Sequence, residues 1–424
     1  MKFKKSLRRL EKRPIPIRRS ARSVTLPIRT GRVSFLVVAL VASVSLAACG
    51  TDNSKSDGSS SKAPIKLAQV ALIDAPIASL PFVQSSVEAA VKAVNAAGGV
   101  GGRQLEISSC NEKNDPNQAV TCVQRAVQDK NTVALVGGVT NYAAQFNPIL
   151  EAAKMPNIGA DAITPGDVVS PTSFLLDAGI PGTLSAMPAA AKEYLGATKV
   201  ATVHADNNPS ASDQLKFFEA GADAAHVSIV KNVTVAADAV DFSPYVAQAE
   251  SAGAQALVTV LSPSVTLGVW KSLTGDLHTL GSDSSTTPDI VKQAGAGAEG
   301  NYVLSGVPAA NEDNEWGKAY IAEMKKYAPD EKTYTALGLR AWASVHLFAD
   351  VASMVDGNIT RESVMNEFSK LHDFDFMWVK SLSYDEDGPL SSYPRIVPAI
   401  TTVFTSHIKD GQYVSDGTFD PFGS

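Results

Sequence analysis

The sequence predicts an α/β protein with two lobes, each built around a parallel central sheet. The first observation is that strands apolar along almost their whole length alternate with helices, which is typical of parallel sheets covered on both faces. The second is that this alternation restarts after a break near residues 177–183. Hydrophobic residues make up 45% of the chain and charged residues 19%, which excludes global disorder and allows a large core. We therefore expect two Rossmann-like lobes.

The first run of elements starts at residues 65–73, where IKLAQVALI has the composition of a buried strand. Val87, Val91 and Val94 then recur at helical spacing, and Gly98-Gly99 ends that helix. The expected elements are strands at 65–73, 103–109, 133–137 and 156–159, and helices at 84–97, 116–129 and 143–154.

The second run shows the same pattern and is followed by a helical segment and a strand-rich tail. Lys409-Asp410-Gly411-Gln412 has the composition of a hairpin turn within that tail. The expected elements are strands at 199–204, 227–230, 255–260, 278–281 and 301–307, helices near 210–224, 243–252, 264–273, 312–327, 333–355 and 360–370, and further strands within 374–415.

The composition of the N-terminus is typical of a secretory signal peptide. Residues 1–32 hold 12 of the 37 Lys and Arg residues and one of the 43 acidic ones, so the remainder carries a net charge of −17. An apolar run, VSFLVVALVASVSLAA at 33–48, follows directly and is short for a spanning helix. The acidic body argues against nucleic acid or an anionic membrane surface as the main partner.

The end of the apolar run, Leu46-Ala47-Ala48-Cys49-Gly50, resembles a bacterial lipobox. That resemblance implies cleavage of a signal peptide 1–48 and attachment of lipid to Cys49. Residues 49–64 are then a flexible tether, because the segment is rich in Ser, Gly, Asp and Lys. An ordinary signal with an incidental cysteine, or an uncleaved anchor helix, is the alternative.

Two cysteines remain if Cys49 carries lipid. Cys110 and Cys122 lie twelve residues apart, at the end of an expected strand and within an expected helix. Their spacing is not that of a CxxC redox motif or a zinc knuckle. In an oxidising compartment we expect a disulfide between them, and two free buried thiols are the alternative.

Polar residues follow the expected strands, at the sheet edge where ligands of open parallel sheets bind. Hydroxyls, amides and isolated carboxylates suit a small zwitterion. The candidate ligand-binding residues are Asp74, Thr140, Asn141, Asp161, Ala162, Thr164, Asp206, Ser262 and Asp283, and His204, Asn207, Asn208, Ser264, Ser282 and Ser284 follow the same strands. Each of them also suits a helix cap or a turn.

The order of several motifs resembles type I periplasmic solute-binding proteins of the leucine/isoleucine/valine-binding branch. The matching runs are Val94-Asn95-Ala96-Ala97-Gly98-Gly99-Val100-Gly101-Gly102-Arg103, Asn114-Asp115-Pro116, Val136-Gly137-Gly138-Val139-Thr140, Asp241-Phe242-Ser243, Ser251-Ala252-Gly253-Ala254 and Lys409-Asp410-Gly411-Gln412-Tyr413-Val414. The resemblance covers nearly all of 65–415. It implies two α/β lobes joined by three crossing segments, with the ligand in the cleft between them and an ABC permease as membrane partner.

The resemblance divides the chain into lobe 1, at 65–177 and 308–380, and lobe 2, at 178–307 and 381–424. It places the hydroxyls for a ligand carboxylate near Thr140 and the 161–164 loop, and the acid for an ammonium at Asp283. Family members often carry aromatic residues after the strands equivalent to 199–204 and 255–260, and this chain has none there. The implied ligand is an amino acid or a related compound, and this departure from the family pattern weakens the case for a branched-chain one.

Three function classes follow from these observations. The first is a lipid-anchored, monomeric, extracytoplasmic binding protein that closes on its ligand and serves an ABC importer. The second is a ligand-sensing receptor of the same fold that signals to a membrane partner. The third is an extracytoplasmic enzyme. Against the third, the sequence contains no GxxxxGK[ST], HExxH or GxSxG motif, and its GxGxxG at 295–300 precedes a strand instead of following one. We expect no cofactor and no metal.

Overall fold

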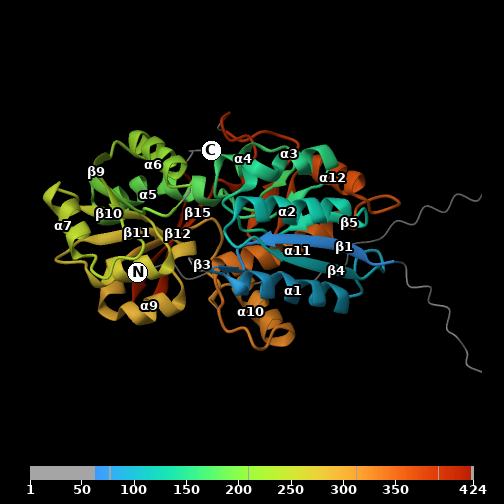
Figure 1. The fold of residues 1–424 in the computed structure, drawn as a ribbon, viewed down its shortest axis with the longest axis horizontal. Helices are drawn as coiled ribbons and strands as arrows, with labels where there is room; N and C mark the ends of the chain where they lie inside the picture. The colour runs from blue at the N-terminus through green and yellow to red at the C-terminus, as the bar shows by residue number, and fades with distance from the viewer. Residues whose placement is uncertain (1–62, 76–77, 209, 312, 390, 422–424) are drawn as a thin grey trace, which may run out of the picture. The chain divides into compact units, whose positions relative to one another are not determined.

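The computed structural model describes residues 63–421, except 76–77, 209, 312 and 390. The predicted signal peptide, Cys49 and almost all of the tether lie outside the described residues. Figure 1 shows two groups of α/β elements, each formed around its own sheet.

The sheet of the first lobe is parallel throughout, with strand order β4-β1-β5-β6-β7. Its strands are β1 Ile65–Ala71, β4 Leu105–Asn111, β5 Thr132–Val136, β6 Asn157–Ile158 and β7 Ser173–Phe174. Alternate residues of β1 belong to different cores, because Leu67 packs with the helices of one face and Val70 with those of the other. The covering helices are α1 Pro81–Ala96 and α11 Ala336–Ala352 on one face, and α2 Pro116–Gln128 and α3 Ala143–Ala153 on the other.

The sheet of the second lobe has the order β16-β15-β12-β11-β10-β8-β9. Its strands are β8 Lys199–Ala205, β9 Ser228–Val235, β10 Ala256–Val260, β11 His278–Ser282, β12 Tyr302–Ser305, β15 Val403–Lys409 and β16 Gln412–Phe419. Five strands run parallel, β15 pairs antiparallel with β12, and β16 pairs antiparallel with β15. The predicted turn is confirmed, since Asp410 and Gly411 join the hairpin with φ angles of 52° and 70°, the left-handed conformation that two-residue turns require.

Helices cover both faces of this second sheet as well. They are α5 Gly179–Leu195 and α6 Ala211–Ala225 on one face, and α7 Ser243–Ser251, α8 Pro263–Lys271 and α9 Pro288–Ala294 on the other. The sequence analysis treated 177–183 as a break and missed α5. The start of α5 contains Gly179, Pro181 and Gly182, which are residue types that usually interrupt helices. A proline in the first turn of a helix, however, costs no backbone hydrogen bond.

The remaining elements lie mostly in the segments that complete the first lobe. They are β2 Asp74–Ala75, β3 Ala78–Ser79, α4 Pro165–Val169, α10 Glu315–Tyr327, α12 Arg361–Ser369, β13 Phe374–Phe376 and β14 Val379–Leu382. Short 3₁₀ helices cover Asp283–Ser285, Gly295–Ala298 and Pro398–Ile400.

The chain passes between the two cores three times. The passages join β7 to α5, β12 to α10, and Ile400 to Val403, because Ile400 packs in the first core and Val403 in the second. The last passage therefore lies later than residue 381, where the sequence analysis placed it. The stretch 385–394 carries no apolar periodicity, whereas the buried Tyr384, Ile396 and Val397 around it belong to the first core.

Candidate functional site

A cavity of about 180 Å³ lies where the strands of both sheets end. Segments that follow β1, β5, β6, β8, β10 and β11 contribute to it, which is the position where open parallel sheets bind ligands. We call it the cleft cavity. It is lined by Leu72, Leu80, Asn114, Val139, Thr140, Asn141, Asp161, Ile163, Ile180, Ala205, Asn207, Asn208, Gln214, Val260, Leu261, Ser262, Pro263, Ser282, Ser284 and Leu337.

Thr140 reaches the cavity from a sharp turn after β5. Gly137 turns the chain with a φ of 56°, and a Cβ there would stand 2.9 Å from the Ser344 hydroxyl oxygen and from Val87. The Thr140 hydroxyl donates to Glu112 Oε2 and accepts the N–H of Tyr142 at 3.0 Å. Thr140 is therefore engaged with a carboxyl group of its own chain.

Glu112 is fully buried, and its other oxygen, Oε1, has no hydrogen-bond partner among the described residues. Burial raises the pKa of Glu112 to about 7, although the hydrogen bond from Thr140 opposes that rise. Near neutral pH the carboxyl is thus part protonated. If the proton sits on Oε2, the carboxyl can donate to the Thr140 oxygen, and the Thr140 hydroxyl is then free to donate into the cleft cavity.

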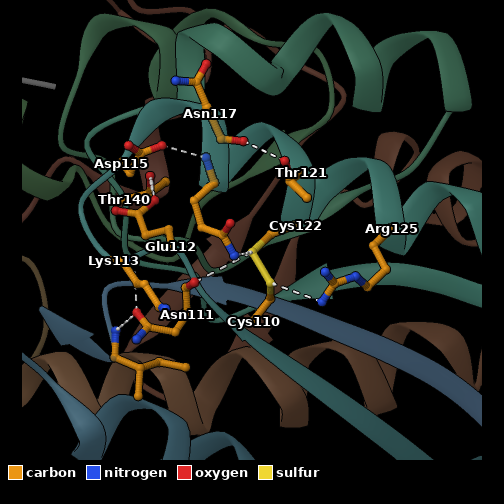
Figure 2. Close-up of a disulfide and its surroundings, with 12 residues drawn as sticks. Cys110, Asn111, Glu112, Lys113, Asp115, Asn117, Thr121, Cys122, Arg125 and Thr140 are labelled. Carbon is orange, nitrogen blue, oxygen red and sulfur yellow. Dashed lines mark hydrogen bonds between the residues drawn. A yellow bond between two sulfur atoms is a disulfide. The ribbon is translucent and has the colours of Figure 1, made fainter.

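The disulfide between Cys110 and Cys122 is confirmed, and it lies close to this pair (Figure 2). It ties the end of β4 to α2, with the loop that carries Glu112 between them. Asp115 caps α2 by accepting the Gln118 N–H at 2.8 Å. The loop below Thr140 is therefore fixed at both ends.

Polar contacts at the cavity also connect the two lobes. Ser210, before α6, donates across the lobes to Asn141 Oδ1 at 3.3 Å, and within the second lobe Asn208 donates to Gln214 Oε1 at 3.0 Å. Helices α3, α6 and α8 begin beside these residues. The dipoles of these helices favour an anionic group near their N-termini.

A buried arginine holds three carboxylates behind the cavity. Arg340, on the mostly apolar α11, pairs with Asp161, with Asp177 at 2.7 Å and with Asp283 at 3.6 Å. Asp161 and Asp177 belong to the first lobe and its first passage, and Asp283 follows β11 of the second. One guanidinium thus links both lobes.

This ion cluster contains more acid than base. The pKa of Asp161 is raised to about 7. Desolvation is the main cause, and repulsion from Asp177 and Asp283 adds to it; together they outweigh the attraction of Arg340. Desolvation also raises the pKa of Asp283, against the attraction of Arg340. Burial lowers the pKa of the Arg340 guanidinium, but the three carboxylates raise it by more, so the arginine stays charged.

The structure brings four of the nine candidate residues to the cleft cavity: Thr140, Asn141, Asp161 and Ser262. Asp283 instead lines a second and larger cavity, of about 970 Å³. The other four candidates are outside both linings.

Those four have partners within the chain. Asp74 is exposed. Ala162 is buried, and its backbone oxygen accepts the Ile180 N–H at 2.7 Å. The Thr164 hydroxyl donates to Asp167 at 2.9 Å, and Asp206 accepts the Ala237 N–H at 3.0 Å. The Thr164 contact belongs to the cap of α4, which is the alternative given above, whereas Asp206 links two loops that are distant in the sequence.

Sequence reasoning missed Glu112, Asn114, Gln214 and Arg340 as members of this region. A lone arginine within the apolar run Leu337–Val345 was a usable signal, because a buried guanidinium needs carboxylate partners. Among the described residues, no group of three or more His, Cys, Asp or Glu side chains is placed to hold a metal ion. None of the helices in the described part has the length and apolar character that spanning a membrane requires.

The comparison with protein families matches residues 65–399 to the periplasmic binding protein model. No curated protein sequence matches the chain. Among solved structures, the leucine-binding protein LivK of Thermotoga maritima superposes with a TM-score of 0.68 and 18% identity, over 84% of this chain and 99% of its own.

Two further structures carry different ligands in their names. The branched-chain amino acid transporter substrate-binding protein LivJ of Streptococcus pneumoniae, in complex with isoleucine, has a TM-score of 0.68 and 20% identity, over 84% of this chain and 98% of its own. The fatty acid ABC transporter substrate-binding protein of Thermomonospora curvata has a TM-score of 0.71 and 16% identity, over 84% of this chain and 92% of its own. These likenesses establish the type I fold. The chain belongs to the periplasmic binding protein family, an extracytoplasmic family of substrate-binding proteins and not of enzymes.

Proposed function

We propose that this protein captures a small amino acid-like solute in the cleft cavity and delivers it to an ABC importer. The observation that carries the proposal is the cleft cavity itself, lined from both lobes by segments that follow strands of both sheets. Its volume of about 180 Å³ corresponds to roughly six water molecules. A long acyl chain needs a longer channel, so an amino acid suits this cavity better than a fatty acid.

The lining has the chemistry for a zwitterion with an apolar side chain. Leu72, Val139, Ile163, Val260 and Leu261 provide apolar wall. The beginnings of α3, α6 and α8 provide dipoles and N–H groups for a carboxylate, as the Thr140 hydroxyl does when Glu112 is protonated.

Asp161 is the candidate partner for the ligand's ammonium group. It is the one acidic residue among those that line the cleft cavity, whereas Asp283 lines the other cavity. An ammonium beside Asp161 would add positive charge to a cluster in which three carboxylates share one guanidinium.

A thermal-shift screen of the purified full chain tests the ligand class, because a binder stabilises the fold in proportion to RT ln(1 + [L]/Kd). Amino acids, amides, ureas, small carboxylates and palmitate form the panel. We expect an amino acid or a close relative to raise the Tm and palmitate to leave it unchanged. A shift with palmitate alone would contradict the proposal.

Calorimetry with the selected solute then tests the site. Asp161→Asn should weaken binding about 30- to 1000-fold, the effect of losing a charge-assisted contact worth roughly 2–4 kcal/mol. Thr140→Val should weaken it about tenfold, the effect of one lost hydrogen bond. Asp74→Asn, an exposed aspartate outside the cavity, is the matched control and should bind as the parent does. Unchanged affinity in Asp161→Asn would remove that residue from the site.

We also propose that Cys49 carries a lipid that holds the protein on the outer face of the membrane. The lipobox-like run at 46–50 supports this anchor, together with the tether that follows. Cys49→Ser should abolish lipid labelling and release the protein or leave an unprocessed precursor. A variant that is still processed and still needs detergent would contradict the anchor.

A further inference from the structure

The Thr140 hydroxyl shares a small number of hydrogen bonds between the protein and the cleft cavity. A hydroxyl has one proton to donate and two lone pairs with which to accept. One lone pair of Thr140 accepts the Tyr142 N–H at 3.0 Å, and Glu112 Oε2 takes a second bond (Figure 2). Because Thr140 also lines the cleft cavity, one bonding position of the hydroxyl remains for a solute.

The proton on Glu112 decides what that remaining position is. An ionised carboxylate only accepts, so it takes the Thr140 proton and leaves a lone pair for a hydrogen-bond donor of the solute. A carboxyl protonated on Oε2 donates to Thr140, which then has its own proton left for an acceptor of the solute. Oε2 is the favoured place for the proton, because Oε1 has no hydrogen-bond partner among the described residues.

The backbone holds Glu112 beneath Thr140. The Glu112 N–H donates to the carbonyl of Ala71, at the end of β1, and its own carbonyl accepts the Asp115 N–H, both at 3.0 Å. The disulfide closes the same loop, and the Glu112 side chain is fully buried. The carboxyl therefore gains or loses its proton in place, against the same hydroxyl.

The charges around Glu112 are mostly acidic. The titratable groups on the neighbouring segments are Lys113 and Asp115 of its own loop, Asp74 after β1, Tyr142 before α3 and Asp167 of α4. Burial is the main cause that raises the pKa of Glu112 to about 7, and repulsion from Asp167 adds to it. Asp161, in the cleft-cavity lining, also has a pKa of about 7, and its ionisation would favour a solute ammonium as the pH rises.

We propose that Glu112 is a positioning residue that sets, through the Thr140 hydroxyl, whether the cleft cavity takes a hydrogen-bond acceptor or a donor of the solute. The protonated form selects a carboxylate, and the ionised form selects a donor such as a carboxamide N–H. An amino acid carboxylate is then bound together with one proton taken up from water. The inference rests on the proposed function, because it places the solute in the cleft cavity.

The control of Thr140 by Glu112 can be tested without a solute. The Tyr142 N–H donates to the Thr140 oxygen, so the Tyr142 amide NMR signal reports a change at that hydroxyl. Between pH 5 and pH 8 the signal should titrate in the parent and in Thr140→Ser and stay constant in Glu112→Gln. Glu106→Gln, at an exposed position of β4, should titrate as the parent does. A constant signal in the parent, or the same titration in Glu112→Gln, would overturn the proposal.

Calorimetry of the purified full chain with L-leucine and L-leucinamide tests the selection itself. The two probes share their body and ammonium group and differ in carboxylate against carboxamide. In Glu112→Gln the amide nitrogen donates to Thr140 at every pH, as the protonated carboxyl does. The ratio of the parent's Kd to that of Glu112→Gln cancels the contributions of Asp161 and of the probe's own ammonium. For L-leucine this ratio should rise about tenfold between pH 6 and pH 8, since only the protonated fraction is competent. For L-leucinamide it should not rise.

Thr140→Val separates the hydroxyl from the charge of Glu112. This variant keeps the carboxyl and removes the group through which it acts, so its Kd for L-leucine should lack the part of the pH dependence that Glu112 causes. The ratio of the parent's Kd to that of Thr140→Val should then rise about tenfold as well, which also replaces Glu112→Gln if that variant does not fold.

Three outcomes of the calorimetry would overturn the proposal: a constant ratio for L-leucine, an equal rise with both probes, or the parent's pH dependence persisting in Thr140→Val. If L-leucine binds to none of these proteins at any pH, the proposed amino acid specificity is contradicted. The Tyr142 titration then still decides whether Glu112 controls Thr140.

Discussion

Glu112 shows how a single buried group can tune a polar site. Its carboxyl lies beneath Thr140, which lines the cleft cavity, and one of its oxygens lacks a partner among the described residues. Because burial raises its pKa to about 7, the folded chain holds this proton more tightly than the unfolded chain does. Glu112 therefore couples folding to pH.

The sign of this coupling can be worked out. The stabilisation is complete below the ordinary pKa of 4.5 and is lost as the pH rises through about 7. Asp161, with a pKa of about 7, and Asp167, with one of about 6, act in the same direction. We expect the parent to lose stability between pH 5 and pH 8 and Glu112→Gln to lose on the order of 3 kcal/mol less.

Urea denaturation at a series of pH values measures this difference. Glu106→Gln, on the exposed face of β4 just before the same loop, is the control and should follow the parent curve. A Glu112→Gln curve parallel to that of the parent between pH 5 and pH 8 would show that Glu112 does not titrate in this range.

At this scale the sequence identified four residues that line the cleft cavity. Thr140, Asn141, Asp161 and Ser262 were found because residues directly after parallel strands are bound to lie at one sheet edge. Which way each side chain points depends on tertiary partners, and Asp283, the predicted ammonium partner, lines the larger cavity and not the cleft cavity. Arg340 was missed because its three carboxylates come from distant parts of the chain.

Among the elements, β4 and α2 are joined by the disulfide that the compartment and the cysteine count predicted. Cys122 is buried in the core between α2, α3 and the sheet, and Cys110 packs at its edge. The loop closed by the bond contains Glu112 and Asn114, which lie beside the cleft cavity. The disulfide therefore constrains the loop that carries Glu112 and Asn114 beside the cleft cavity.

Removing this disulfide should lower the free energy of unfolding by about 3 kcal/mol, the chain-entropy value for a loop of this length. The parent in dithiothreitol and the double variant Cys110→Ala/Cys122→Ala should both show the loss in chemical denaturation. The reductant is the cleaner test, because it leaves both side chains in place. Recovery of two alkylated thiols from unreduced native protein would contradict the bond itself.

Helices α5 and α6 pack at a contact that requires glycine. A Cβ on Gly221 would stand 2.1 Å from the carbonyl oxygen of Ser185 on the neighbouring helix. Alanine is the better helix former by up to about 1 kcal/mol, so propensity alone predicts that Gly221→Ala stabilises. We expect the opposite, a loss of roughly 1–3 kcal/mol, because overpacking outweighs propensity.

Thermal denaturation distinguishes these two effects. Ala224→Gly, on the exposed side of the same helix, is the matched control and should cost about 1 kcal/mol through propensity alone. A higher Tm for Gly221→Ala than for the parent would show that α5 can move away without penalty.

The alternation of strands and helices could be read from the sequence because buried parallel strands are apolar throughout. Helix α5 could not, since Gly179, Pro181, Gly182 and Pro188 all lie in it and its stability comes from packing against α6. The last passage between lobes was placed too early for a similar reason. Residues 385–394 have no period that shows which core they join.

For the molecule as a whole, the two cores are joined by three passages and by Arg340. Asp177 lies in the first passage, and a Cβ on Gly306, in the second, would stand 2.6 Å from the Asp177 Cβ. The passages therefore touch where the ion cluster sits. We expect rotation of one lobe against the other, if it occurs, to pivot at this junction.

The last prediction concerns that rotation. A solute in the cleft cavity contacts residues of both lobes, such as Thr140 of the first and Ser262 of the second, so it binds the closed arrangement more tightly than the open one. It can shift the population only by that difference in affinity. We expect small-angle scattering to give a smaller radius of gyration when the parent is saturated with the solute that screening selects. Ser262→Trp, with its cleft cavity filled, should give the same curve with and without solute. An unchanged profile for the saturated parent would mean that binding proceeds without hinge closure, and the contacts from both lobes would then have to exist before the solute arrives.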